Sequence, residues 1–154
     1  MSYTQPPRLT EDEIDIFLNE KKIAKICTLN KDRTVHATAV WFLYRNGSMI
    51  MCTPAATRKV KNIVRNNNVT VLVDDPETAR GVLIYGKAKL ESEYSFRVAA
   101  SLFEKYVSIQ QAAKLAREMS RISKGGAVMI TVKADRMISY DNTKDTLLKL
   151  DAEK

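Results

Sequence analysis

The sequence predicts an α+β fold, mainly β, in which an antiparallel β-barrel of about six strands carries peripheral helices. Two observations lead to this prediction. Short segments of strand patterning follow one another through the chain, and an Asn-Gly pair joins two of them as a tight hairpin. Only the stretch of about 92–124 has a long helical period. At 154 residues, the chain has the length of a single domain, 1–154.

The chain opens with a helix and a strand. Thr10-Glu11-Asp12-Glu13 is a capping box, and apolar residues follow it at helical spacing, so a short amphipathic helix begins there. Residues 22–29 then have strand patterning and end at the turn-prone segment 30–33.

Residues 34–45 predict one strand with two different faces. One face holds only apolar side chains, namely Val35, Ala37, Ala39, Trp41 and Leu43. The other face is mixed and carries Thr34, His36, Thr38, Val40, Phe42 and Tyr44. We expect the apolar face, Trp41 included, to pack in the core, and the mixed face to meet a ligand or a partner subunit. Asn46-Gly47 joins this strand to another over 48–53.

The later segments continue the pattern. Residues 57–66 predict a helix with Val60, Ile63 and Val64 inward, and strands follow over 69–74 and 80–91. Within the second of these, Gly86 and Ala88 leave one face with little bulk, which suits the close approach of another backbone or of a flat ligand.

The C-terminal third begins with a helical insertion of about 92–124, in which a second capping box at Ser108 marks the joint between two helices. One or two strands over 127–133 and 136–140 complete the barrel. The charged tail of about 142–154 is expected to be frayed or to form a short amphipathic helix.

The composition excludes several classes of protein. The chain has two cysteines and one histidine, too few for a disulfide-stapled fold or a structural zinc site. It has no leader-like apolar segment and no apolar run of membrane-spanning length, so we expect a cytoplasmic protein without a membrane partner. A net charge of +7 favours an anionic partner.

Part of the positive charge is concentrated. Arg58, Lys59, Lys61 and Arg65 lie in a segment without acidic residues, at the start of the helix predicted behind Thr53. Helix N-termini bind anions, and Thr53 and Thr57 add hydroxyl donors, so this segment suits a single phosphate. A solvated basic helix face has equal weight on composition alone. Nucleic acid fits less well, because no aromatic residues are interleaved with the basic ones.

The segment from Cys52 to Asn62 resembles the strand end, Ser/Thr-Arg-Lys motif and following helix of the pyridoxamine 5′-phosphate oxidase-like, FMN-binding split-barrel proteins. The hairpin before it, with Val35–Phe42 and Asn46-Gly47, resembles the family's second and third strands. Val82–Leu90 is similar to its strand of apolar residues followed by Gly-x-Ala-x-Leu. The likeness covers roughly residues 10–92.

The resemblance implies a six-stranded antiparallel split β-barrel and a homodimer with two flavin sites at the subunit interface. It implies that Arg58 and Lys59 hold the FMN phosphate together with Thr53 and Thr57, that the second strand lines the flavin ring, and that Met51 and Cys52 lie beneath the ring or ribityl chain. The implied cofactor-binding residues are His36, Ala37, Thr38, Val40, Trp41, Met51, Cys52, Thr53, Thr57, Arg58, Lys59 and Asn62.

The chain also departs from the family pattern. Val35 and Ala39 stand where prolines are common, and the basic strand residues and basic C-terminal motif of true pyridoxamine phosphate oxidases are missing, which argues against that activity. The sequence therefore suggests a flavin-dependent oxidoreductase acting on an unidentified small molecule, with catalytic residues unassigned. Two alternatives stay open: a deazaflavin-dependent reductase, and a non-catalytic flavin or haem carrier or sensor.

Overall fold

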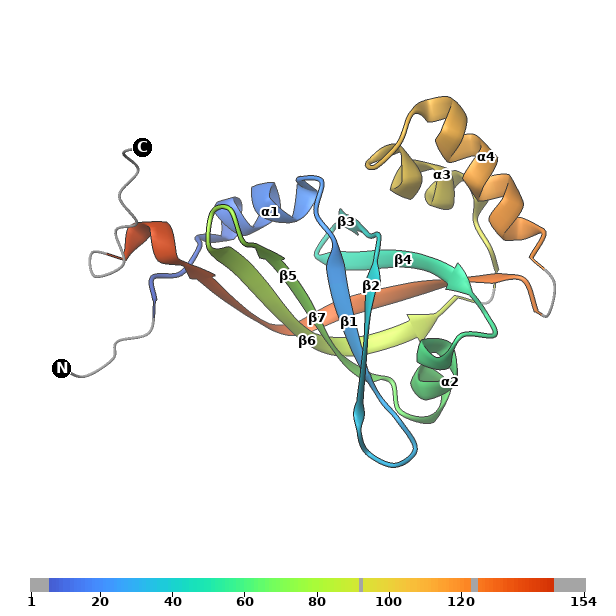
Figure 1. The fold of residues 1–154 in the computed structure, drawn as a ribbon, viewed down its shortest axis with the longest axis horizontal. Helices are drawn as coiled ribbons and strands as arrows, with labels where there is room; N and C mark the ends of the chain where they lie inside the picture. The colour runs from blue at the N-terminus through green and yellow to red at the C-terminus, as the bar shows by residue number, and fades with distance from the viewer. Residues whose placement is uncertain (1–5, 92, 123–124, 146–154) are drawn as a thin grey trace.

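A computed structural model of the chain describes residues 6–91, 93–122 and 125–145. One curled antiparallel sheet forms a half-barrel with the strand order β2-β1-β5-β6-β7-β4-β3 (Figure 1). The predicted antiparallel, mainly β fold is confirmed. The strands are β1 (Ala24–Leu29), β2 (Val35–Val40), β3 (Leu43–Arg45), β4 (Ser48–Pro54), β5 (Asn68–Asp75), β6 (Arg80–Leu90) and β7 (Ala127–Asp141). The helices are α1 (Glu11–Asn19), α2 (Arg58–Arg65), α3 (Phe96–Glu104) and α4 (Ile109–Ser120), with a 3₁₀ turn η1 (Asn142–Lys144).

The sheet has seven strands, one more than predicted, because residues 34–45 do not form one strand. The strand pairing breaks at Trp41 and Phe42, so that β2 pairs with β1 while β3 pairs with β4 at the other end of the sheet. The Tyr106 hydroxyl fills this break. It accepts the Phe42 N–H at 3.1 Å and donates to the Lys22 carbonyl at 2.8 Å.

The two faces of β2 are oriented opposite to the prediction. Val35 is 66% exposed, and Ala37 and Ala39 are exposed as well, whereas Thr38 and Val40 lie on the inner side opposite Ile26 and Ala24 of β1. The reason is that the inner side of a barrel needs bulk as well as apolarity. Two alanines fill it less well than Val40 and Phe42, which continue the inner row.

The turns follow the sequence closely. Asn46 and Gly47 both have positive φ, 52° and 71°, as a tight two-residue hairpin requires. At Gly86 the neighbouring backbone comes very near, because an added Cβ would lie 2.1 Å from the Lys133 carbonyl oxygen. The predicted close approach is therefore made by β7, at the place where the β6–β7 register shifts.

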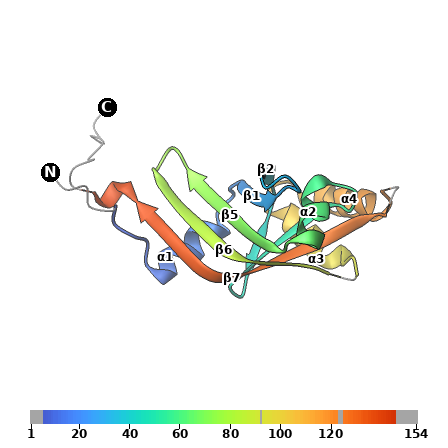
Figure 2. The same cartoon turned by 90° about the horizontal axis from the view of Figure 1, so that it is seen from below.

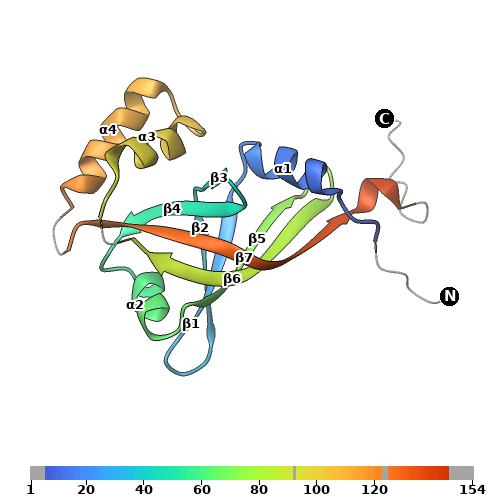
Figure 3. The same cartoon turned by 180° about the vertical axis from the view of Figure 1, so that it is seen from behind.

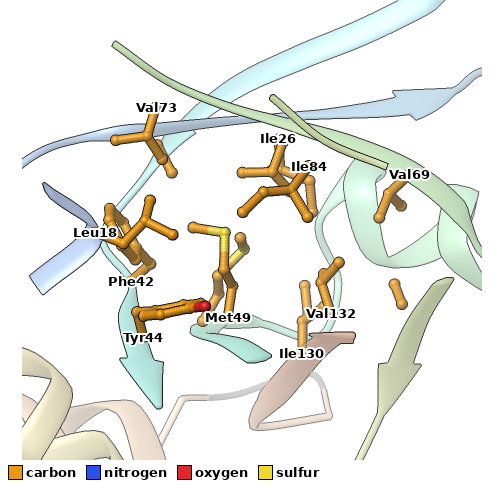
Figure 4. Close-up of a cluster of buried hydrophobic side chains, with 14 of the residues drawn as sticks. Leu18, Ile26, Phe42, Tyr44, Met49, Val69, Val73, Ile84, Ile130 and Val132 are labelled. Carbon is orange, nitrogen blue, oxygen red and sulfur yellow. The ribbon is translucent and has the colours of Figure 1, made fainter. Parts of the chain in front are cut away.

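A single apolar core fills the inside of the half-barrel (Figure 4). Phe17 and Leu18 of α1 close one end, where Phe42 lies beside Leu18, and Met49 and Ile84 lie farther inside, all fully buried. Val60 and Ile63 of α2 contribute at the other end. Figures 1 and 2 place α1 and α2 toward opposite ends of the sheet.

The helical insertion forms a hairpin of α3 and α4 beside β4 (Figure 3). It packs on the outer side of β4 and β7 through a second apolar cluster that includes Leu102, Phe103 and Met129. Both predicted capping boxes are present, at Thr10 with Glu13 and at Ser108 with Gln111. β7 is one continuous strand, and most of the charged tail, 146–154, lies outside the described residues.

Candidate functional site

The start of α2 lies directly behind the end of β4. Pro54 is the last paired residue of β4, opposite Ala127, and a short turn leads to Thr57, the N-cap of the helix. The Thr57 backbone N–H donates to the Pro54 carbonyl at 3.2 Å, which fixes the turn. The first amides of a helix point outward without partners inside it, so they face the region in front of this turn.

The Thr57 hydroxyl is buried and has no hydrogen-bond partner among the described residues, although it stands at a position where threonine normally caps the helix. A buried hydroxyl without a partner costs free energy, and proteins contain few of them. This oxygen is therefore available to a group that the chain itself does not supply.

Lys59 lies on the inner side of α2. Its ammonium donates to the Thr53 hydroxyl at 3.2 Å, and burial lowers the pKa of Lys59. Thr53 itself is buried on the inner face of β4. Within the described residues no carboxylate pairs with Lys59, so a half-buried positive charge stands beside the Thr53 hydroxyl without a counter-charge.

The predicted basic cluster is divided by the helix. Lys59 points toward Thr53, whereas Arg58, Lys61 and Arg65 line a hollow on the other side, next to Lys31 of the β1–β2 turn. Burial of Val60 and Ile63 in the core sets this division, since it fixes which way each side chain of α2 points. The structure thus brings Thr53 and Lys59 together, whereas Arg58, next to Thr57 in the chain, lies with Lys61 and Arg65 at the hollow.

Asn62 is an anchor within the protein. It is 2% exposed, and its amide donates to the Thr28 hydroxyl at 3.1 Å and to the Asn30 side-chain oxygen at 3.0 Å. Its own oxygen accepts from Arg65 at 2.8 Å. Asn62 takes the inward position that we predicted for Val64, which is 72% exposed instead. Its bonds tie α2 to β1 and hold the helix start in place.

The predicted second-strand residues lie on different sides of the sheet. His36, Thr38 and Val40 are half-buried on the inner side, and the Thr38 hydroxyl is buried without a partner, whereas Ala37 faces outward. Trp41 lies at the break after β2. Its ring stacks on Tyr106 with centroids 4.6 Å apart, so it packs against the α3–α4 hairpin instead of the barrel core.

Met51 and Cys52 also point to opposite faces, as successive strand residues must. Met51 is 1% exposed inside the half-barrel. Cys52 lies under the α3–α4 hairpin, where burial raises the pKa of its thiol to about 11 and keeps the thiol protonated at neutral pH. The structure therefore does not bring Met51 and Cys52 together on one face.

The sequence of residues 10–138 matches the profile of the pyridoxamine 5′-phosphate oxidase family. The chain belongs to this family. The family's split-barrel, flavin-binding fold is the curled sheet described above, and the resemblance noted from the motifs is confirmed. No curated protein sequence matches the chain.

Several solved structures share this oxidase-family fold. The conserved hypothetical protein Rv2991 from Mycobacterium tuberculosis is 27% identical, with a TM-score of 0.76 over 91% of each chain. A protein described as an F420 reductase is 17% identical, with a TM-score of 0.64 over 80% of this chain and 94% of that one. General stress protein 26 from Bacillus anthracis is 19% identical, with a TM-score of 0.63 over 84% and 92%.

Sequence reasoning missed two residues that shape this member of the family. Tyr106 fills the break between β2 and β3, and Lys105 donates to the Leu18 carbonyl at 2.8 Å at the end of α1. Both contacts join residues more than sixty positions apart, and no local pattern signals them. In the described part of the chain, no helix is long and apolar enough to cross a membrane.

Proposed function

We propose that the chain binds FMN, with the FMN phosphate at the start of α2, and that it works as a flavin-dependent oxidoreductase. The observation that supports this most directly is the Thr57 hydroxyl, which is buried without a partner next to a helix N-terminus. A phosphate oxygen would accept its hydrogen bond. The residues present therefore fit the cofactor that the family implies.

Each residue of the proposed phosphate site has a distinct task. Thr53 holds the Lys59 ammonium in place, and Lys59 supplies a positive charge that no carboxylate in the described chain neutralises. Arg58 stands on the exposed side of α2, where its guanidinium can close over the anion from the solvent. The helix dipole adds to the same field.

The flavin, when bound, supplies the hydride chemistry, and the protein positions it. An acid–base triad is accordingly not required of this chain. The basic strand residues and basic C-terminal motif of true pyridoxamine phosphate oxidases are missing, which favours another small molecule as the substrate.

A second subunit is part of the proposal. Val35, Ala37 and Ala39 form an exposed apolar row on the outer side of β2, and this row continues onto β1 through Cys27 and Leu29. An apolar sheet face of this kind is suited to contact with another copy of the chain. The family's homodimer, with cofactor sites at the interface, agrees with it.

The phosphate assignment is tested by titrating FMN into the purified chain and following the quenching of flavin fluorescence. We expect Arg58→Gln with Lys59→Gln to weaken FMN binding about 100-fold, because two charge-assisted hydrogen bonds are lost. Lys87→Gln with Lys114→Gln removes the same charge from exposed positions elsewhere and should leave the affinity unchanged. Equal affinity of the two double variants would contradict the assignment.

Two further arms separate the alternatives. The same titration with deazaflavin F420 distinguishes a deazaflavin-dependent reductase, since that cofactor should then bind more tightly than FMN. Turnover assays of the loaded protein with nicotinamide donors separate an enzyme from a carrier or sensor. Tight flavin binding without turnover by any donor would favour the carrier.

A further inference from the structure

The hollow that Arg58, Lys61 and Arg65 line lies beside the proposed phosphate site, between α2 and the β1–β2 turn. It has a volume of about 400 Å³, and Lys31, Arg58, Lys61 and Arg65 line it together with Ala56 and Asn62. We refer to the space between these four cationic residues as the basic hollow. None of the described residues that line it is acidic.

The basic hollow has two walls. Arg58, Lys61 and Arg65 are spaced by three and four positions, so they form one stripe along α2 that is about 10 Å long at the usual helical rise. Lys31 stands opposite, on the turn that follows β1. Positive charge therefore faces the hollow from two separate elements of the fold.

The chain holds part of this charge in position. The Arg65 guanidinium donates to the Leu29 carbonyl at 3.0 Å, to the Asn62 side chain at 2.8 Å and to the Lys61 carbonyl at 3.4 Å. Asn62 in turn is bonded to Thr28 and Asn30. The chain itself thus holds the guanidinium in place at the edge of α2 that lines the hollow.

One carboxylate near the hollow offsets part of its positive charge. The nearest acidic residue on the turn, Asp32, uses its carboxylate to accept hydrogen bonds from Thr34. These bonds lower the pKa of Asp32, and the charge of Arg58 contributes to the same shift. Asp32 is therefore ionised at neutral pH, but four cationic residues line the hollow, so its net positive charge favours a bound anion.

We propose that the basic hollow binds a second anionic group, so that the natural ligand of this chain is an oligoanion with phosphate or carboxylate groups spread over about 10 Å. Arg58 is shared with the proposed FMN phosphate site, but Lys31, Lys61 and Arg65 are not, so variants of these three residues test the inference separately from the proposed function. A small ligand fits better than nucleic acid, because no aromatic side chain lines the hollow for base stacking.

The test is calorimetric titration of the full chain at low ionic strength with three probes: orthophosphate, tripolyphosphate and citrate. We expect tripolyphosphate or citrate to bind at least tenfold more tightly than orthophosphate, and which of the two binds better identifies phosphate or carboxylate as the anionic group. Lys31→Gln with Lys61→Gln should weaken that binding about tenfold, since two charge contacts are removed. Lys87→Gln with Lys114→Gln, which lowers the net charge equally, should not weaken it.

Three results would overturn the proposal. The first is an equal loss in both double variants, which indicates a nonspecific charge effect. The second is salt-dependent binding of a short single-stranded oligonucleotide in the absence of tripolyphosphate or citrate binding, which favours nucleic acid. The third is a loss of FMN affinity in Lys31→Gln with Lys61→Gln as large as that in Arg58→Gln with Lys59→Gln. This result would mean that the hollow is part of the FMN site. A chain that binds tripolyphosphate or citrate as predicted but no flavin would instead refute only the proposed function.

Discussion

Thr57 and Lys59 share a property that is unusual for residues so near a protein core. In the part of the chain that the structure describes, the Thr57 hydroxyl has no hydrogen-bond partner and the Lys59 ammonium has no carboxylate partner. Both features lower the stability of the chain alone and favour a bound anion. A trade between stability and binding is therefore expected at these two positions.

Thr57→Val tests this trade, because valine has nearly the same shape and lacks the hydroxyl. We expect the free energy of unfolding to stay within about 0.5 kcal/mol or to rise, since no hydrogen bond is lost, while FMN affinity falls about fivefold to tenfold. Urea unfolding and the flavin titration measure the two effects.

Ser108→Ala is the contrasting control for that experiment. The Ser108 hydroxyl does accept the Gln111 N–H, as the cap of α4, so its removal should lower the free energy of unfolding by about 1 kcal/mol and leave FMN binding unchanged. If Thr57→Val destabilised the chain as much as Ser108→Ala does, the hydroxyl of Thr57 would have an internal partner after all.

The sequence shows that the positive charges are concentrated in α2, but it does not show in which direction each side chain points. Four cations in eight residues predict an anion site, yet the split between Lys59 and the basic hollow depends on which face of the helix enters the core. Asn62 decides this, because it is buried through hydrogen bonds to Thr28 and Asn30 that no helical pattern reveals. The helical pattern assigns apolar residues to the inner face, so it placed Val64 there and gave no reason to place Asn62 there.

Two adjacent residues at the joint of the α3–α4 hairpin add polar contacts to the apolar cluster that packs the hairpin on the barrel. Tyr106 bonds the backbone between β2 and β3, and the Lys105 ammonium reaches the last turn of α1 while lying 3.7 Å from the centre of the Phe42 ring. Burial, together with the nearby charge of Lys22, lowers the pKa of Lys105 to about 8. The hairpin, α1 and the core are thus linked through one titratable group.

The docking of the hairpin should consequently depend on pH. Between about pH 8 and the usual lysine pKa of 10.5, the folded chain binds fewer protons at Lys105 than the unfolded chain does, so this residue makes the free energy of unfolding rise with pH. Lys105→Met should remove that contribution. Urea unfolding of both proteins at pH 7.5 and pH 9.5 measures the difference, and parallel changes in the two would contradict the assignment.

Local signals predicted the elements well where a single residue type is required. Asn46-Gly47 needed positive φ at both positions, the two capping boxes needed their hydroxyl and carboxyl or amide partners, and Gly86 needed room for β7. The prediction of which face of β2 is buried was wrong, because alternation separates two sets of side chains without indicating which set lies inside. That choice depends on the volume that Val40 and Phe42 fill in the core.

The molecule as a whole leaves part of the outer side of its sheet uncovered, at β2. The half-barrel encloses its core on the inner side, while the outer side of β2 presents Val35, Ala37 and Ala39 to solvent. Because the cofactor sites of the proposed dimer lie at the interface, assembly and flavin binding should be lost together when this face is made polar.

Val35→Asp tests that link. A buried, unpaired carboxylate is strongly unfavourable, so we expect the variant to be a monomer by light scattering after gel filtration and to bind FMN at least tenfold more weakly. Ile16→Asp changes a similarly exposed side chain, 64% against 66%, on the distant helix α1, and should leave both properties unchanged. If the wild-type chain were a monomer in the light-scattering measurement and still bound FMN, the proposed dimer would be refuted.

The tyrosine at the joint of the helical hairpin also limits how this scaffold can be re-engineered. An engineer who replaces residues 93–122 with a shorter cap, in order to open the outer side of β4 and β7, also removes the group that satisfies the Phe42 N–H and the Lys22 carbonyl. At this corner of the barrel, the break between β2 and β3, water or a new side chain would then have to bond these two backbone groups. Caps exchanged among such scaffolds should therefore carry a hydroxyl to that corner as part of the graft.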